Sequence, residues 1–135
     1  MLIRDSRPGD QAALMRLAHE LHPEHGLRAL KPVRLESRTF AAEADDEVIG
    51  FALVTLTDYG LESCGYIEEL VVEESNRGDG IGTALLQRCV DWLKENDVFV
   101  LFLSSRDDMS DRFYLARGFE RCKRPWLVRL VAPKS

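Results

Sequence analysis

A glycine-rich segment between a predicted strand and a predicted helix contains the residues best suited to hold a phosphate group. Arg77, Gly80 and Gly82 follow the pattern Arg-x-x-Gly-x-Gly and directly precede a run with helical periodicity. Glycines allow positive φ angles, so successive backbone N–H groups can point into one concavity. The N-terminus of the helix adds unsatisfied donors and a partial positive charge. The pattern therefore predicts a phosphate or pyrophosphate site, with the guanidinium of Arg77 beside it.

Two other phosphate-binding motifs fit this segment less well. A P-loop needs Gly-Lys-Ser/Thr at the start of the helix, and no lysine stands there. A dinucleotide fingerprint would need a third glycine where Thr83 stands, after Gly78 and Gly80. A strand-to-helix turn that uses its glycines only for tightness remains an open alternative on these residues alone.

Hydrophobic periodicity predicts the elements that position this turn. We expect strands at 2–4, 39–44, 48–57, 66–72, 98–103 and 126–131, and helices at 11–22, 81–93 and 110–116. The segment 24–36 has room for a further short helix. The run 98–103 is almost wholly apolar, so we expect it to be buried on both faces. The order predicts one α/β domain over residues 1–135, with an antiparallel meander in the middle of a mixed sheet.

Local signals mark the ends of several of these elements. Asp10 is expected to cap the first helix, and Gly118 to end the last one. The charged turn at 45–47 is expected to join the two strands of a hairpin.

The composition and charge of the chain argue against several classes of protein. The 135 residues carry 18 basic and 23 acidic side chains, for a net charge of −5, which argues against nucleic-acid binding. No apolar stretch is long enough for a membrane span. Charges arrive too early at the N-terminus for a secretory signal, so we expect a cytoplasmic protein. Cys64, Cys89 and Cys122 form no C-x-x-C motif and are expected to be reduced thiols.

The ordered set of motifs resembles the GNAT superfamily of acetyl-CoA-dependent N-acetyltransferases. The resemblance rests on Leu70-Val71-Val72 before the Arg-x-x-Gly-x-Gly turn, and on the sequence Phe-Tyr-Leu-Ala-Arg-Gly-Phe at 113–119. The opening Ile-Arg at 3–4, followed by Pro-Gly-Asp at 8–10, also looks like the usual start of that family. The resemblance covers essentially the whole chain.

The resemblance implies a single domain with a mostly antiparallel sheet and helices on both faces. The parallel strands 66–72 and 98–103 would splay apart to admit acetyl-CoA, the co-substrate, and no metal is implied. The implied reaction is direct attack of a primary amine on the thioester within a ternary complex. The acceptor would be a small-molecule amine or a protein amino group, and a homodimer is compatible with the sequence. Two alternatives stay open: a non-catalytic CoA-sensing or partner-binding module, and another nucleotide-phosphate binder.

Residue roles follow from the resemblance position by position. The strand backbone would pair with the pantetheine arm, and the turn would hold the pyrophosphate. The implied cofactor-binding residues are Leu70, Val71, Val72, Arg77, Gly78, Asp79, Gly80, Ile81, Gly82 and Thr83. Tyr114 matches the tyrosine that protonates the departing thiolate, a step that a phenol can perform. The alternative for Tyr114 is a ring that only packs.

A catalytic carboxylate is also expected, because the attacking amine must lose its proton. Glu68 and Glu69 lie in the strand where several family members carry one. Strand residues alternate in direction, so we expect only one of them to face the cleft. The resemblance favours Glu68, which stands nine residues before Arg77, the more frequent position of the carboxylate in the family. The alternative is that both are polar residues of a solvated sheet. Asp107 departs from the family pattern, which commonly has an Asn there, and an ionised Asp cannot donate a hydrogen bond.

Overall fold

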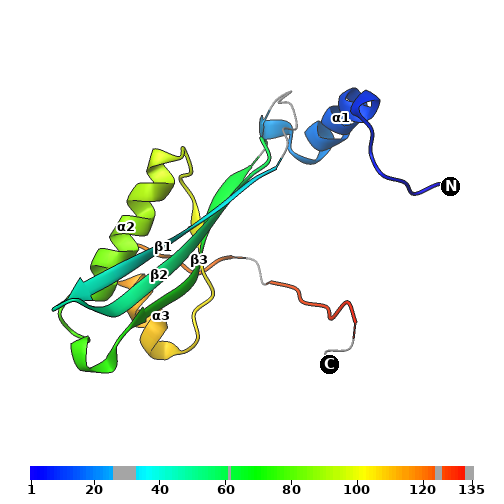
Figure 1. The fold of residues 1–135 in the computed structure, drawn as a ribbon. Coiled ribbons are helices and arrows are strands. Elements are labelled where there is room, and N and C mark those ends of the chain that lie inside the picture. The colour runs from blue at the N-terminus through cyan, green and yellow to red at the C-terminus, as the bar shows by residue number, and fades with distance from the viewer. Residues whose placement is uncertain (26–32, 61, 124–125, 133–135) are drawn as a thin grey trace. The chain divides into compact units, whose positions relative to one another are not determined.

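A computed structural model of the chain describes residues 1–25, 33–60, 62–123 and 126–132 (Figure 1). Two compact units are present, Met1–Ser104 and Ser105–Ser135, and each is described by itself. The expectation of one domain over 1–135 therefore stays a prediction.

The first unit is built on a four-stranded sheet with the order β1-β2-β3-β4. The strands are β1 (Arg34–Ala44), β2 (Glu47–Asp58), β3 (Ser63–Val72) and β4 (Leu101–Phe102). The first three strands form an antiparallel meander, and β3 and β4 are parallel. Asp45 and Asp46, at φ 51° and 62°, form the two-residue turn between β1 and β2. The predicted α/β class, mostly antiparallel with one parallel pair, is confirmed.

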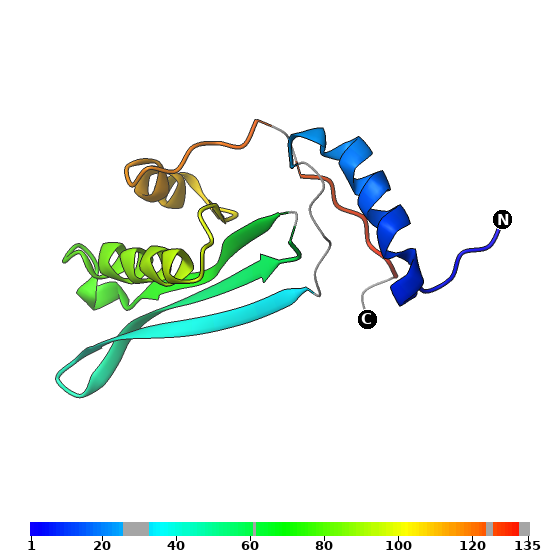
Figure 2. The same ribbon diagram turned by 90° about the horizontal axis from the view of Figure 1, so that it is seen from above.

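The core of this unit lies between the sheet and α2 (Ile81–Glu95), which runs along one face of it (Figure 2). Alternate residues of β2 point into that layer, since Ala52, Val54 and Leu56 are buried. Gly65 of β3 lies against the helix so closely that an added Cβ would be 2.5 Å from Cδ1 of Leu93. Glycine at this position therefore lets the helix approach the sheet. The predicted helix over 81–93 is confirmed and extends slightly further.

The strand predicted at 98–103 is mostly wrong. Only Leu101 and Phe102 form β4, opposite Gly65 and Tyr66. Val98 is buried, but the side chain of Phe99 is 76% exposed, so the run is not buried on both faces. Within the described ranges, the parallel ladder ends at the pair Tyr66–Phe102, as expected for two strands that splay apart.

The terminal strands predicted at 2–4 and 126–131 are also wrong in this structure. Both segments are described, and neither is assigned to a strand. The side chains of Leu2 and Ile3 are exposed, as are the apolar side chains of 126–131. A short apolar run becomes a strand only when its backbone finds a partner edge, which the residues themselves do not specify.

The N-terminal helix is α1 (Gln11–Leu21), close to the predicted 11–22. It follows η1 (Pro8–Asp10) and precedes η2 (Pro23–His25); residues 26–32 of the predicted second helix lie outside the described residues. Asp10 does occupy the N-cap position of α1, but its side chain does not cap it. Its carboxylate instead accepts the N–H of Arg7 and pairs with Arg4 at 2.9 Å.

The second unit contains α3 (Asp108–Leu115), which includes most of the predicted 110–116. Gly118 has φ 91°, and the N–H of Phe119 reaches back to the carbonyl of Tyr114 at 3.2 Å. This confirms the predicted glycine at the helix end, because a left-handed residue lets the last carbonyls be satisfied. No helix among the described residues is long and apolar enough to span a membrane.

Candidate active site

A β-bulge in the middle of β3 positions the two candidate carboxylates. Ile67 lies opposite Val54 of β2, and Glu69 lies opposite the preceding residue, Leu53. Glu68 is therefore an extra residue with no partner in the register. A bulge of this kind bends a strand and redirects its side chains.

The bulge changes which residues of β3 face α2. Before it, Gly65 and Ile67 face the helix, as their close contact and burial show. After it, Leu70 and Val72 do, because they lie opposite Ala52 and Gly50, which are buried on the same side. The residues between them, Glu68 and Glu69, both face the other side of the sheet.

The alternation from which we expected only one of the two glutamates to face the cleft is thus wrong. The extra residue interrupts it at the two carboxylates. Glu69 is opposite Leu53, which is itself directed away from α2 because its neighbours Ala52 and Val54 are buried against it.

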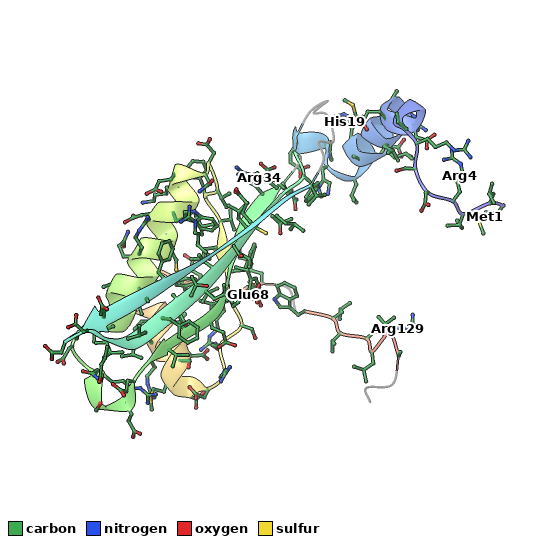
Figure 3. All side chains as sticks on the ribbon, in the orientation of Figure 1. Met1, Arg4, His19, Arg34, Glu68 and Arg129 are labelled. Carbon is green, nitrogen blue, oxygen red and sulfur yellow. The ribbon has the colours of Figure 1, made fainter. Side chains whose placement is uncertain are left out.

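Thr55 of β2 fixes the side chain of Glu68, which is labelled in Figure 3. Its hydroxyl Oγ1 donates a hydrogen bond to Oε1 of Glu68 at 3.0 Å. Glu68 is otherwise exposed, whereas Glu69 is half-buried. Sequence reasoning missed Thr55, because nothing near Thr55 in the chain indicates that the carboxylate of Glu68 lies beside it on the neighbouring strand.

Past the β3–β4 ladder, the outer edge of β3 is open, in the sense that no strand among the described residues pairs with it. The N–H of Glu73 bonds to the carbonyl of Ile49 on β2, so by antiparallel alternation the backbone of Val71 also faces β2. The backbone groups of Leu70 and Val72 then face the opposite edge, where the β3–β4 ladder has already ended. Of the three residues expected to pair with a pantetheine arm, Leu70 and Val72 have the required direction.

The glycine-rich turn follows this edge directly. Nε of Arg77 donates to the carbonyl oxygen of Val72 at 3.0 Å, so the guanidinium lies at the end of the strand and beside the turn. Gly78 and Gly80 have φ values of 93° and 82°, which favour glycine, and an added Cβ would meet no atom within 4 Å at either position. The space in front of both backbones is therefore open.

The start of α2 completes this arrangement. Gly80 occupies the N-cap position and has no side chain with which to cap the helix, and Ile81, Gly82 and Thr83 form the first turn. Asp79 and Thr83 are exposed. First-turn N–H groups of a helix attract anions, so this segment has the donors that a pyrophosphate needs.

Tyr114, the predicted acid, lies on α3 in the second unit. Its ring is half-buried and meets Phe113 and Phe119 edge-on, with centroids 5.0 Å and 5.3 Å away. These ring contacts are compatible both with the role of acid and with the alternative of a ring that only packs. Its approach to the carboxylates of the first unit stays a prediction.

Asp107 acts as the N-cap of α3. Its carboxylate accepts the backbone N–H of Ser110 at 2.8 Å, and this hydrogen bond holds the pKa of Asp107 below its ordinary value. The position that departs from the family pattern therefore has a structural role here, in which an acceptor is all that is required.

Comparison with known proteins identifies the family. The model of the Acetyltransferase (GNAT) family matches residues 11–119, which include the bulge, the turn and Tyr114. The chain belongs to the GNAT family of acetyltransferases.

Individual relatives agree with this assignment. A curated relative, aminoglycoside N(6')-acetyltransferase type 1 of Stenotrophomonas maltophilia, is 34% identical over 145 residues, covering 98% of this chain and 95% of the relative. A predicted acetyltransferase with acetyl-CoA from Clostridium acetobutylicum is structurally similar, with a TM-score of 0.63 at 20% identity, covering 96% of this chain and 80% of that one. A ribosomal-protein-alanine N-acetyltransferase from Brucella melitensis biovar Abortus 2308 has a TM-score of 0.60 at 19% identity, covering 70% and 71%. These two structures support the GNAT fold alone.

The other chemically active side chains of this GNAT chain include its cysteines and histidines. Cys64, Cys89 and Cys122 are all free thiols, as predicted, and burial raises the pKa of Cys89 to about 11. Nδ1 of His22 lies 3.5 Å from Oε1 of Glu24, and this pair lies at the protein surface. Among the residues that the structure describes, no group of three or more His, Cys, Asp or Glu side chains is placed to hold a metal ion.

Proposed function

We propose that this GNAT chain transfers the acetyl group of acetyl-CoA to a primary amine by direct attack within a ternary complex. The observation that carries the proposal is the continuous run from the open edge of β3 into the left-handed glycines at the start of α2. That run has the hydrogen-bonding groups for an extended arm followed by a pyrophosphate.

The residues present fit acetyl-CoA as a co-substrate. The backbone groups of Leu70 and the N–H of Val72 would hold the pantetheine arm, since the carbonyl of Val72 accepts from Arg77. The turn from Gly78 to Thr83 would hold the pyrophosphate. Arg77, fixed at the end of β3, would add positive charge beside it. Acetyl-CoA supplies a thioester carbonyl that an amine can attack.

Two side chains of the protein transfer protons in the proposed reaction. Glu68 accepts the proton that the acceptor amine must lose, directly or through a water molecule. The phenol Oη of Tyr114 donates a proton to the sulfur as negative charge develops there. Backbone N–H groups of β3 stabilise the charge on the carbonyl oxygen. Glu69, on the same side of the sheet, adds negative charge there, which would attract a positively charged acceptor.

The proposal specifies the acceptor as a class, the primary amines. The relative from Stenotrophomonas maltophilia is named for aminoglycosides, so an aminoglycoside amine is the first acceptor to test, and a protein amino group is the second. We propose further that the two units act as one domain, which is supported by a family match that spans both. The cytoplasmic location and a homodimer remain predictions from the sequence.

The first test is a thermal shift of the purified chain with acetyl-CoA, CoA, ATP and NAD in parallel. A ligand at a hundred times its Kd stabilises a protein by about 2.7 kcal/mol, which a melting curve detects. Mass spectrometry of aminoglycosides, simple diamines and peptides incubated with acetyl-CoA would then identify acetylated products. We expect stabilisation by acetyl-CoA and CoA and one acetylated class of amine.

The other outcomes separate the alternatives. Stabilisation by CoA without acetylation of any amine in the panel would favour the non-catalytic CoA-sensing module. Stabilisation by ATP or NAD in competition with CoA would favour another nucleotide-phosphate binder. No stabilisation by any of the four would contradict the proposal and leave the glycines as a structural turn.

A further inference from the structure

We propose that Thr55 is a positioning residue that holds the carboxylate of Glu68 in its working orientation. This inference rests on the proposed function, in which Glu68 accepts the proton of the acceptor amine. Its basis is the hydrogen bond of 3.0 Å from Oγ1 of Thr55 to Oε1 of Glu68, which joins two adjacent strands.

Glu68 needs an external anchor because of its place in the bulge. It is the one residue of that stretch of β3 without a register partner on β2, and it is exposed. A glutamate side chain has several rotatable bonds, so fixing it costs rotamer entropy. A proton acceptor must nevertheless be held in one geometry to work efficiently.

Thr55 can supply that anchor because it is itself rigid. It lies between Val54 and Leu56, which are buried, and it is opposite Tyr66 in the antiparallel register. Threonine is branched at Cβ, so the direction of its hydroxyl on a strand is restricted. The hydroxyl thus offers a fixed donor to a mobile carboxylate.

The bond also divides the work of the two carboxylate oxygens. Oε1 accepts the hydroxyl of Thr55, and Oε2 would receive the acceptor's proton.

The test compares variants at two threonines of the same strand. Thr55→Val keeps the branched shape and removes the donor, whereas Thr55→Ser keeps the donor and removes a methyl group. Thr57→Val is the matched control, because Thr57 is on the same side of the sheet but lies opposite Cys64. We expect Thr55→Val to lower kcat about tenfold with the KM for acetyl-CoA unchanged. Thr55→Ser should restore most of kcat, and Thr57→Val should resemble the wild type.

A double variant asks whether Thr55 acts through Glu68. Adding Thr55→Val to Glu68→Gln should cause little further loss, since the carboxylate to be positioned is already gone. The positioning role would be overturned if the losses in kcat of Thr55→Val and Glu68→Gln multiplied in the double variant. It would also be overturned if Thr55→Val were as active as Thr57→Val. Melting temperatures of all variants separate these outcomes from poor folding.

The same set distinguishes this inference from the function on which it rests. If Glu68→Gln is inactive while Thr55→Val is fully active, the positioning role fails and the role of Glu68 stands. If Glu68→Gln is as active as the wild type, Glu68 is not the proton acceptor and both fail. A chain that acetylates no amine would overturn both as well.

Discussion

Glu68 and Glu69 are neighbours in the chain and face the same side of the sheet. In an uninterrupted strand they would face opposite sides, but Glu68 is the extra residue of a β-bulge opposite Leu53 and Val54. Two carboxylates on one side of β3 make a division of roles feasible, in which one moves a proton and the other attracts a cation.

This relationship predicts different kinetic signatures for the two glutamates. Glu68→Gln should lower kcat about a hundredfold, because general base catalysis contributes on this scale. Glu69→Gln should mainly raise the KM for a positively charged amine. Steady-state kinetics with the identified acceptor would measure both. The opposite pattern would make Glu69 the proton acceptor.

The left-handed glycines predict a loss of both stability and CoA binding when a Cβ is added. Gly80→Ala should cost about 1 kcal/mol in the free energy of unfolding, since φ is 82° there, and should weaken CoA binding by displacing the start of α2. Urea unfolding and calorimetry would measure the two effects. Gly9→Ala is the control, because an added Cβ meets nothing within 4 Å and φ is not positive. Equal behaviour of both variants would contradict the argument.

The phenol of Tyr114 predicts a change in rate with little change in binding. Tyr114→Phe keeps the edge-on ring contacts with Phe113 and Phe119 and removes only the proton donor. We expect kcat to fall about a hundredfold, with the Kd for CoA unchanged. Tyr59→Phe is the control, since its hydroxyl donates to Glu62 instead. Similar losses in kcat and in CoA binding would contradict the role of general acid.

The N-cap of α3 predicts a stability difference that depends on pH. The pKa of Asp107 is lowered in the folded state by the N–H of Ser110, so its contribution is fully present above the ordinary aspartate pKa, about pH 4. The contribution is lost as the pH falls through the lower folded value. Asp107→Ala should therefore destabilise the protein most above about pH 4, and less as the pH falls below that value. Asp107→Asn, which keeps an acceptor above and below that value, should lose much less than Asp107→Ala at pH 7. A pH-independent cost of the alanine variant would exclude the cap.

The sequence by itself determined the features that depend on neighbouring residues. The helical periodicity from Ile81, the glycines before it and Gly118 at the end of α3 are where the pattern predicted them. The hairpin turn predicted at 45–47 is also present, although Glu47 belongs to β2. Each depends on backbone preferences that act within a few residues. The family motifs are also short runs of neighbouring residues, so they can be recognised in the sequence without the tertiary structure.

Only the tertiary structure decided the features that need a second segment. The runs 2–4, 98–103 and 126–131 have strand composition, but a strand requires a partner edge, and two of the three have none in this structure. The bulge at Glu68 exists only in the register between β2 and β3, so the direction of both carboxylates could not be counted along one strand. The hydrogen bond between Thr55 and Glu68 also depends on the tertiary structure. The two residues are far apart in the chain, and the pairing of β2 with β3 brings them within hydrogen-bonding distance.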